Sequence, residues 1–198
     1  MRRALPWVLF VVTACGGDID PSSGVDAPPG AVVDAPGGGG PDAPGGVGEP
    51  AELAGITLAH NEARAAVGVP PLTWDPALAA IATAWVQKCT DVEAPAGLVD
   101  HNAGRSTGYP TYVGENIYAS SGTATGPGAV ASWVSEKNNY DYASNTCASG
   151  KICGHYTQVV WRNTTKVGCA LYNCSGLTYS STIVCDYGPG GNDGGKPY

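Results

Sequence analysis

The chain has 198 residues, of which 43% are hydrophobic and 14% are charged, and its formal net charge is −7. Residues 16–52 contain seven acids and no base, whereas residues 53–198 contain ten acids and eight bases. The second part therefore carries a formal charge of only −2 and has no basic cluster, which argues against nucleic acid as a partner.

The N-terminus has the pattern of an export signal. Its first fifteen residues, MRRALPWVLFVVTAC, join two arginines to an apolar run that ends in small residues and a cysteine, which predicts a signal peptide over residues 1–14. The apolar run is shorter than the roughly 20 residues that a membrane-spanning helix needs. The sequence VTAC at residues 12–15 resembles the lipobox of bacterial lipoproteins, which implies a lipid on Cys15. The alternative is an ordinary signal peptide with a chance cysteine and a secreted product.

Residues 15–52 are rich in Gly, Pro and Asp, and the tripeptide Asp-Ala-Pro recurs at residues 26, 34 and 42. A segment with so few large apolar side chains cannot bury enough surface to fold. We therefore expect a disordered linker that holds a single folded domain, residues 53–198, away from a membrane at the cell surface or in the periplasm.

The domain is predicted to begin with helices. Apolar residues spaced three or four apart predict a first helix over residues 53–67, in which His60 serves the core or a cap. Asp75 as N-cap and Pro76 in the first turn predict the start of a second helix. A third helix is predicted over residues 128–137, after a loop rich in Gly, Ser and Thr.

The pattern then changes from helical spacing to alternation. Residues 155–162, 167–172 and 178–187 are predicted strands, joined by short polar turns into an antiparallel meander. The first of them places His155 at the start of a face that continues into apolar residues. Helices followed by strands predict an α+β fold.

Six cysteines remain in the domain once Cys15 is set aside, and an even number in an exported chain predicts disulfides. They lack the paired C-x-x-C spacing of a zinc finger. Their number alone leaves the pairing open. They are Cys89, Cys147, Cys153, Cys169, Cys174 and Cys185.

Four polar residues are candidates for a shared cleft: His101, Glu115, Glu136 and His155. Neutral imidazoles are good zinc ligands, and a glutamate can complete the metal's ligands, hold a water or orient a ligating histidine. A hydrogen-bond network without a metal is the alternative. The spacing of the four residues does not decide between the two.

Five motifs in order along the chain are similar to those of one family, the CAP superfamily of cysteine-rich secretory, antigen and pathogenesis-related proteins. The resemblance covers residues 53–198 and is strongest to the plant pathogenesis-related branch, whose chains also end in Pro-Tyr. It implies a three-layer α-β-α sandwich. The motifs are HNEAR at 60–64, PLTWDPAL at 71–78, GEN at 114–116, GHYTQVVW at 154–161 and CDYGPGGN at 185–192.

The resemblance assigns the four polar residues to the family's cleft tetrad, in which two histidines bind zinc or another divalent cation. His101 and His155 are then the metal ligands. The surroundings of His101 are less typical, because Asn102 stands where a serine is common.

The resemblance also implies a ligand site and a set of disulfides. Sterol-binding relatives use an aromatic-rich loop, and Tyr140 and Tyr142 lie in the corresponding region here. Packing of these tyrosines against the core is the alternative. The implied disulfides link Cys89 to Cys174, Cys147 to Cys153, and Cys169 to Cys185.

Three functions remain open. The first is a monomeric, tethered binding module for a sterol or a fatty acid. The second is a metal-dependent hydrolase or protease with Glu115 or Glu136 as general base. Because the sequence lacks the H-E-x-x-H motif, we rank the enzyme below the binding module. The third is an interaction module whose cleft or C-terminal segment contacts another macromolecule.

Overall fold

The computed structural model describes residues 48–198. The predicted signal peptide, Cys15 and most of the predicted linker lie outside the described residues. Among the residues described, no helix has the length and hydropathy needed to cross a membrane.

Ordered contacts with the domain begin a few residues before the predicted boundary at Leu53. The carboxylate of Glu49 accepts hydrogen bonds from the backbone amides of Gly55 and Thr57, at 2.6 and 3.0 Å. These amides surround the start of the first α-helix, where amides lack partners within the helix. The end of the predicted linker therefore caps the domain's first helix.

A four-stranded sheet lies at the centre, in the order β1-β5-β6-β2. The first pair is parallel and the other two pairs are antiparallel, and a separate antiparallel hairpin joins β3 to β4. The strands are β1 (Thr73–Trp74), β2 (Gly114–Ser120), β3 (Tyr140–Asp141), β4 (Thr146–Cys147), β5 (Lys166–Asn173) and β6 (Ser181–Gly188).

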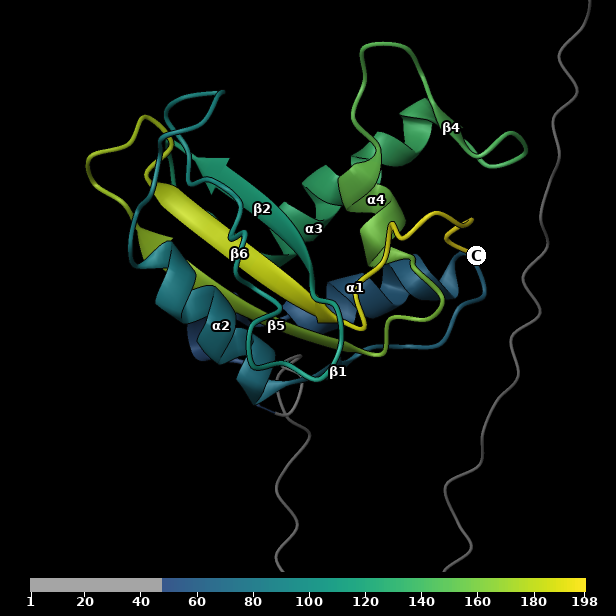
Figure 1. Cartoon of the computed structure of the whole chain (residues 1–198), viewed down its shortest axis with the longest axis horizontal. Helices are drawn as coiled ribbons and strands as arrows, with labels where there is room; N and C mark the ends of the chain where they lie inside the picture. Colours follow the sequence, from purple (N-terminus) through teal and green to yellow (C-terminus); the bar gives the residue numbers. More distant parts are fainter. Residues whose placement is uncertain (1–47) are drawn as a thin grey trace, which may run out of the picture. The chain divides into compact units, whose positions relative to one another are not determined.

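Helices cover both faces of this sheet (Figure 1). On one face α2 packs on β5 and β6, and on the other α1, α3 and α4 contact one another. The arrangement confirms the predicted α+β class and the three-layer α-β-α sandwich. The helices are η1 (Ala51–Leu53), α1 (Ile56–Ala65), α2 (Pro76–Val86), α3 (Gly126–Ser135), η2 (Glu136–Asn139) and α4 (Gly154–Val159), where η marks a 3₁₀ helix.

The helix starts follow local sequence signals. Asp75 Oδ1 accepts hydrogen bonds from the amides of Ala77 and Leu78 at 2.8 and 3.2 Å, which confirms the predicted N-cap of α2. The first predicted helix is instead divided, because Gly55 has a φ of 84° and separates η1 from α1. Such a positive φ is accessible to glycine without steric cost.

The prediction of a strand over residues 155–162 is wrong, because this segment forms the short helix α4. Four consecutive residues of α4, 156–159, are buried, so the segment is enclosed on all sides although Thr157 and Gln158 are polar. A short buried segment of this kind fits a helix as well as a strand. The predicted meander reduces to the hairpin of β5 and β6, and β2, which was not predicted, pairs with the other edge of β6.

Buried Arg64 on α1 holds the end of α4 in place. Its guanidinium donates hydrogen bonds to the carbonyl oxygens of Pro70, Val159, Trp161 and Thr164, at 2.7 to 2.9 Å. Four accepting carbonyls compensate for the loss of water around this fully buried side chain. The position of α4, and of the histidine at its start, therefore depends on α1.

The structure contains the three disulfides that the resemblance implies. One joins the segment just after α2 to the loop after β5, one closes the loop before α4, and one links directly paired residues of β5 and β6. Three such bonds are typical of exported domains. The pairs are Cys89–Cys174, Cys147–Cys153 and Cys169–Cys185.

Candidate functional site

The four residues of the predicted tetrad form two His–Glu pairs. His101 Nδ1 lies 2.6 Å from Glu115 Oε1, and His155 Nδ1 lies 2.6 Å from Glu136 Oε1. An ionised carboxylate only accepts hydrogen bonds, so each Nδ1 carries a proton and donates it. In a neutral ring the proton on Nδ1 leaves Nε2 with a free lone pair. Both histidines are therefore set to bind a ligand through Nε2.

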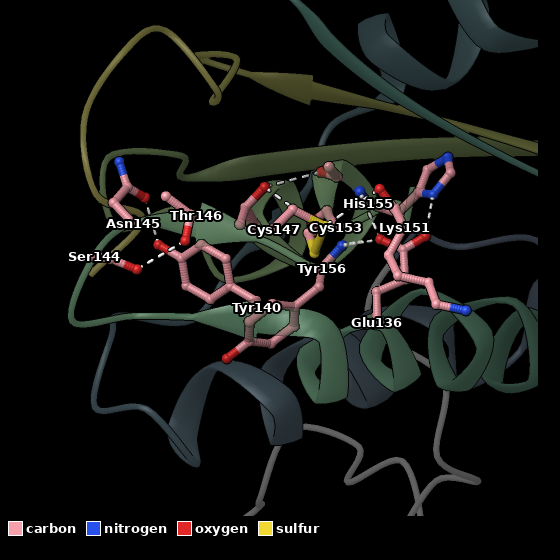
Figure 2. The surroundings of a disulfide bond; sticks show 12 residues. Glu136, Tyr140, Ser144, Asn145, Thr146, Cys147, Lys151, Cys153, His155 and Tyr156 are labelled. Atoms are coloured by element: carbon pink, nitrogen blue, oxygen red, sulfur yellow. Dashed lines mark hydrogen bonds and ion pairs between the residues drawn. A yellow bond between two sulfur atoms is a disulfide. The ribbon is translucent and has the colours of Figure 1, made fainter. Parts of the chain in front are cut away.

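Glu136 also holds the start of α4. Its Oε2 accepts hydrogen bonds from the amides of His155 and Tyr156, at 3.0 and 3.1 Å (Figure 2). A negative charge is favourable at a helix N-terminus, where amide dipoles point outward. Trp133, three residues before Glu136, stacks on the His155 ring with centroids 6.4 Å apart. The backbone and ring of His155 are thus positioned by one short segment of the chain.

Glu115 performs the equivalent task for His101 from the edge strand β2. Its Oε1 accepts a second hydrogen bond, from the amide of Asn102, at 2.9 Å. The Glu115 side chain is fully buried, whereas the side chains of His101 and His155 are 55% and 25% exposed. The carboxylate is therefore enclosed by protein, while the imidazole rings remain accessible.

The two rings line a cavity of about 530 Å³, together with Arg105, Gln158 and Asn192. These three other polar side chains are already bonded within the protein: Arg105 to two carbonyls and a hydroxyl, and Gln158 and Asn192 through both oxygen and nitrogen. Neither His101 Nε2 nor His155 Nε2 has a hydrogen-bond partner within residues 48–198. Both imidazoles therefore keep a ring nitrogen that is free to bind a ligand in this cavity.

The donor set limits the kind of metal site that the cleft can form. In the part of the chain that the structure describes, no group of three or more His, Cys, Asp or Glu side chains is placed to hold a metal ion. The two imidazoles fit a zinc site in which water or a bound molecule fills the other positions. The paired carboxylates fit as well, because metal-ligating histidines commonly donate their other N–H to a carboxylate.

Asp186 is a further residue at this site that sequence reasoning missed. It lies directly opposite Glu115 in the pairing of β2 with β6, is fully buried, and neither of its oxygens has a partner within the described residues. Burial and the facing Glu115 raise the pKa of Asp186 to about 8. At neutral pH Asp186 is therefore mainly uncharged. The signal for Asp186 in the sequence was the presence of one acid among the apolar residues of the strand predicted over residues 178–187.

Tyr140 and Tyr142, the predicted ligand-binding residues, make contacts within the protein. The ring of Tyr140 lies 5.9 Å from that of Tyr156, and the two are seen together in Figure 2. Tyr142 stacks on C-terminal Tyr198 with ring centroids 4.6 Å apart and donates a hydrogen bond to its backbone oxygen. Tyr140 lines a cavity of about 520 Å³, and Tyr142 is not among its lining residues. A ligand role for the two tyrosines stays a prediction.

Comparison with known proteins shows the family. The CAP model, described as the cysteine-rich secretory protein family, matches residues 57–187. Pathogenesis-related protein 1B of Nicotiana tabacum is 48% identical over 142 residues, which cover 71% of this chain and 77% of that protein. The solved structure of Schistosoma mansoni venom allergen-like protein 4 has a TM-score of 0.56 at 26% identity, over 76% of this chain and 95% of that one.

A second solved structure, that of NaASP2 with Zn²⁺, has a TM-score of 0.52 at 23% identity and shows the same fold over 72% of this chain and 81% of that one. The match to pathogenesis-related protein 1B is a match of sequence as well as of fold, and it covers more than two thirds of each chain. The chain therefore belongs to the CAP family of cysteine-rich secretory proteins, as a CAP-domain protein of the pathogenesis-related type.

Proposed function

We propose that this protein is a binding module that holds a divalent cation, zinc in the first place, between His101 and His155. The observation that supports this function is that each Nδ1 is bonded to a glutamate while each Nε2 is free at a shared cavity. The negative charges of Glu115 and Glu136 lie next to the rings and balance a bound dication. The Zn²⁺ in the NaASP2 structure is consistent with this proposal.

The chain's own residues favour binding over hydrolysis. Both oxygens of Glu136 accept hydrogen bonds, from the ring and backbone of His155 and from the amide of Tyr156, so this carboxylate serves to position His155. Glu115 likewise bonds His101 through one oxygen, and its other oxygen is buried. A bound zinc ion would supply Lewis acidity and open positions for oxygen ligands. The two histidines would hold such an ion, and the two glutamates would orient the histidines and balance its charge.

Zinc titration of the full chain by calorimetry tests the proposal. We expect one site of modest affinity at pH 7.5, because the chain supplies only two ligands. His155→Ala should abolish binding, Glu136→Gln should weaken it by about 10- to 100-fold, and acid pH should weaken it as the imidazoles protonate. Tyr142→Phe, a variant away from the cleft, should bind as the wild type does. Undiminished binding by a His101→Ala, His155→Ala double variant would refute the proposal.

We also propose that a lipid on Cys15 anchors the protein to a membrane, since the sequence around Cys15 resembles a lipobox. Expression of Cys15→Ser in a bacterial host should then shift the protein from the membrane fraction to the soluble fraction. If the variant and the wild type partition equally, the anchor does not exist.

A further inference from the structure

Strand β5 forms an open edge of the central sheet over most of its length. Its neighbour on that side, β1, pairs only with Lys166 and Val167, because the chain then enters α2 at Pro76. From Gly168 to Asn173, no other strand within residues 48–198 lies beside this edge. At about 3.3 Å per residue, the open stretch is on the order of 20 Å long.

The register of the sheet shows which backbone groups point out of this edge. Cys169 and Cys185 lie directly opposite each other with Cα atoms 4.1 Å apart, the short spacing of a pair that exchanges no hydrogen bonds. The N–H and C=O of Cys169 therefore point away from β6, and those of Leu171 do the same, because the direction alternates along a strand. The Val167 carbonyl follows the same alternation and accepts a hydrogen bond from the Asp75 amide at 2.8 Å.

The outward backbone groups of Cys169 and Leu171 have no hydrogen-bond partner between residues 48 and 198. A cavity of about 370 Å³ lies along this part of β5 and is here called the edge groove. It shares no lining residue with the His/Glu cleft. Beside residues 169–171, its lining consists of one face of α2 (Pro76, Ala79, Thr83 and Gln87) and of residues near the start of the domain and in β1 (Gly48, Pro50, Glu52 and Trp74).

The open edge lacks the features that usually protect such a strand from pairing. Sheets commonly protect an exposed edge with a charged residue, a proline or a bulge. The open stretch of β5, GCALYN at residues 168–173, contains no charged residue and no proline. N–H and C=O groups that alternate at strand spacing are complementary to the main chain of another extended segment. The edge groove is therefore suited to a strand.

The walls of the edge groove favour a single extended segment over a second copy of this protein. The open edge is flanked by α2 and by the residues around η1, and β5 of a second copy would carry the same two flanking walls. These walls would collide before the two strands could pair. Glu52 is the one charged residue among the described lining residues, so a positively charged side chain is favoured on the occupant.

We propose that the edge groove binds an extended peptide segment of a partner protein, which adds to the sheet as a strand beside β5 and carries a lysine or arginine next to Glu52. The peptide's main chain donates to the outward C=O groups of Cys169 and Leu171 and accepts from their N–H groups. The small side chains of Ala79 and Thr83 leave space for those of the peptide. This inference is independent of the metal site.

Calorimetric titration of the full chain with the hexapeptide acetyl-Lys-Thr-Val-Thr-Val-Thr-amide tests the inference. Two N-methylated forms serve as matched probes, one methylated at the first, third and fifth residues and the other at the second, fourth and sixth. Only alternate amides of an added strand point toward its neighbour. We therefore expect one methylated form to lose binding and the other to bind as the unmethylated peptide does. A peptide with Glu in place of Lys should bind more weakly.

Thr83→Trp places a large side chain in the edge groove and should abolish peptide binding. The matched control is Ala84→Trp at the next position of α2, which is exposed and does not line the groove. Both variants should melt at the wild-type temperature, which separates a blocked groove from a misfolded protein. Glu52→Gln should weaken binding of the Lys peptide by about two- to fivefold.

Three results would overturn the inference. The first is failure of the unmethylated peptide to bind, and the second is an equal effect of methylation at the two sets of residues. The third is wild-type peptide binding by Thr83→Trp. Dimers of the chain alone that Thr83→Trp disrupts, seen by analytical ultracentrifugation, would assign the edge to a second copy and would overturn it as well.

Discussion

Each cleft histidine is hydrogen-bonded to a glutamate, and this bond determines which ring nitrogen can bind a ligand. The carboxylates of Glu115 and Glu136 accept the Nδ1 protons, so that both rings offer the same nitrogen to the cavity. From the sequence alone, either glutamate could have been a metal ligand or a general base in the cleft. In the structure each is instead bonded to a histidine. Their hydrogen bonds turn four polar residues into two oriented ligands.

Asp186 destabilises the fold at neutral and alkaline pH. Its pKa is about 8 in the folded protein and 3.8 in its ordinary state, so its contribution to stability is fully present below pH 3.8 and is lost as pH rises through 8. Asp186→Asn removes the ionisation and gives Glu115 an amide donor. We expect the variant to be more stable than the wild type at pH 8, by on the order of a few kcal/mol.

Thermal unfolding followed by circular dichroism measures this difference, since each kcal/mol shifts the melting temperature by about 2 to 4 °C in a domain of this size. Asp193→Asn, which removes an exposed acid, is the control and should leave the melting temperature unchanged. A lower melting temperature for Asp186→Asn than for the wild type at pH 8 would show that the carboxyl group makes a favourable interaction.

At the scale of the element, the sequence predicted helices where local signals were strong. The Asp75 cap and Pro76 define the start of α2, and Thr125 caps α3, which begins two residues before the predicted start at residue 128. These signals act through hydrogen bonds within one turn, so they are readable from a short stretch of sequence.

The failures at this scale depend on distant contacts. The segment 155–162 alternates like a strand, yet Glu136 bonds the first amides of α4 and Arg64 bonds carbonyls at its end. β2 was missed because it begins Gly-Glu-Asn and its apolar residues do not alternate clearly. Both elements carry or position a cleft histidine. The residues of the site were predictable through the family motifs, whereas the pairing of each glutamate with a histidine was not.

For the whole molecule, buried His60 sets a second pH limit on stability. It bonds Ile56 O and the Tyr187 hydroxyl, both at 2.8 Å, and burial lowers its pKa from 6.5 to about 4. Its contribution to stability is present above pH 6.5 and is lost as pH falls to 4, because the unfolded chain takes up the proton first. Between pH 4 and 6.5 this trend opposes that of Asp186.

The Asp186→Asn variant separates the two trends. Its melting temperature should fall as pH drops from 6.5 to 4, where the unfolded chain takes up a proton on His60, and should stay level between pH 6.5 and 8. The wild type should instead lose stability between pH 6.5 and 8. A variant whose melting temperature does not change between pH 6.5 and 4 would contradict the assignment to His60.

The central claim is that one cation is shared by two imidazoles that are oriented by glutamates, and anomalous diffraction from zinc-soaked crystals tests it most directly. Data collected at the zinc absorption edge should show a peak about 2.0–2.1 Å from both His101 Nε2 and His155 Nε2, with each Nδ1 still bonded to its glutamate. A cleft without an anomalous peak, or a peak bound by the carboxylates of Glu115 or Glu136 in place of the ring nitrogens, would contradict the claim.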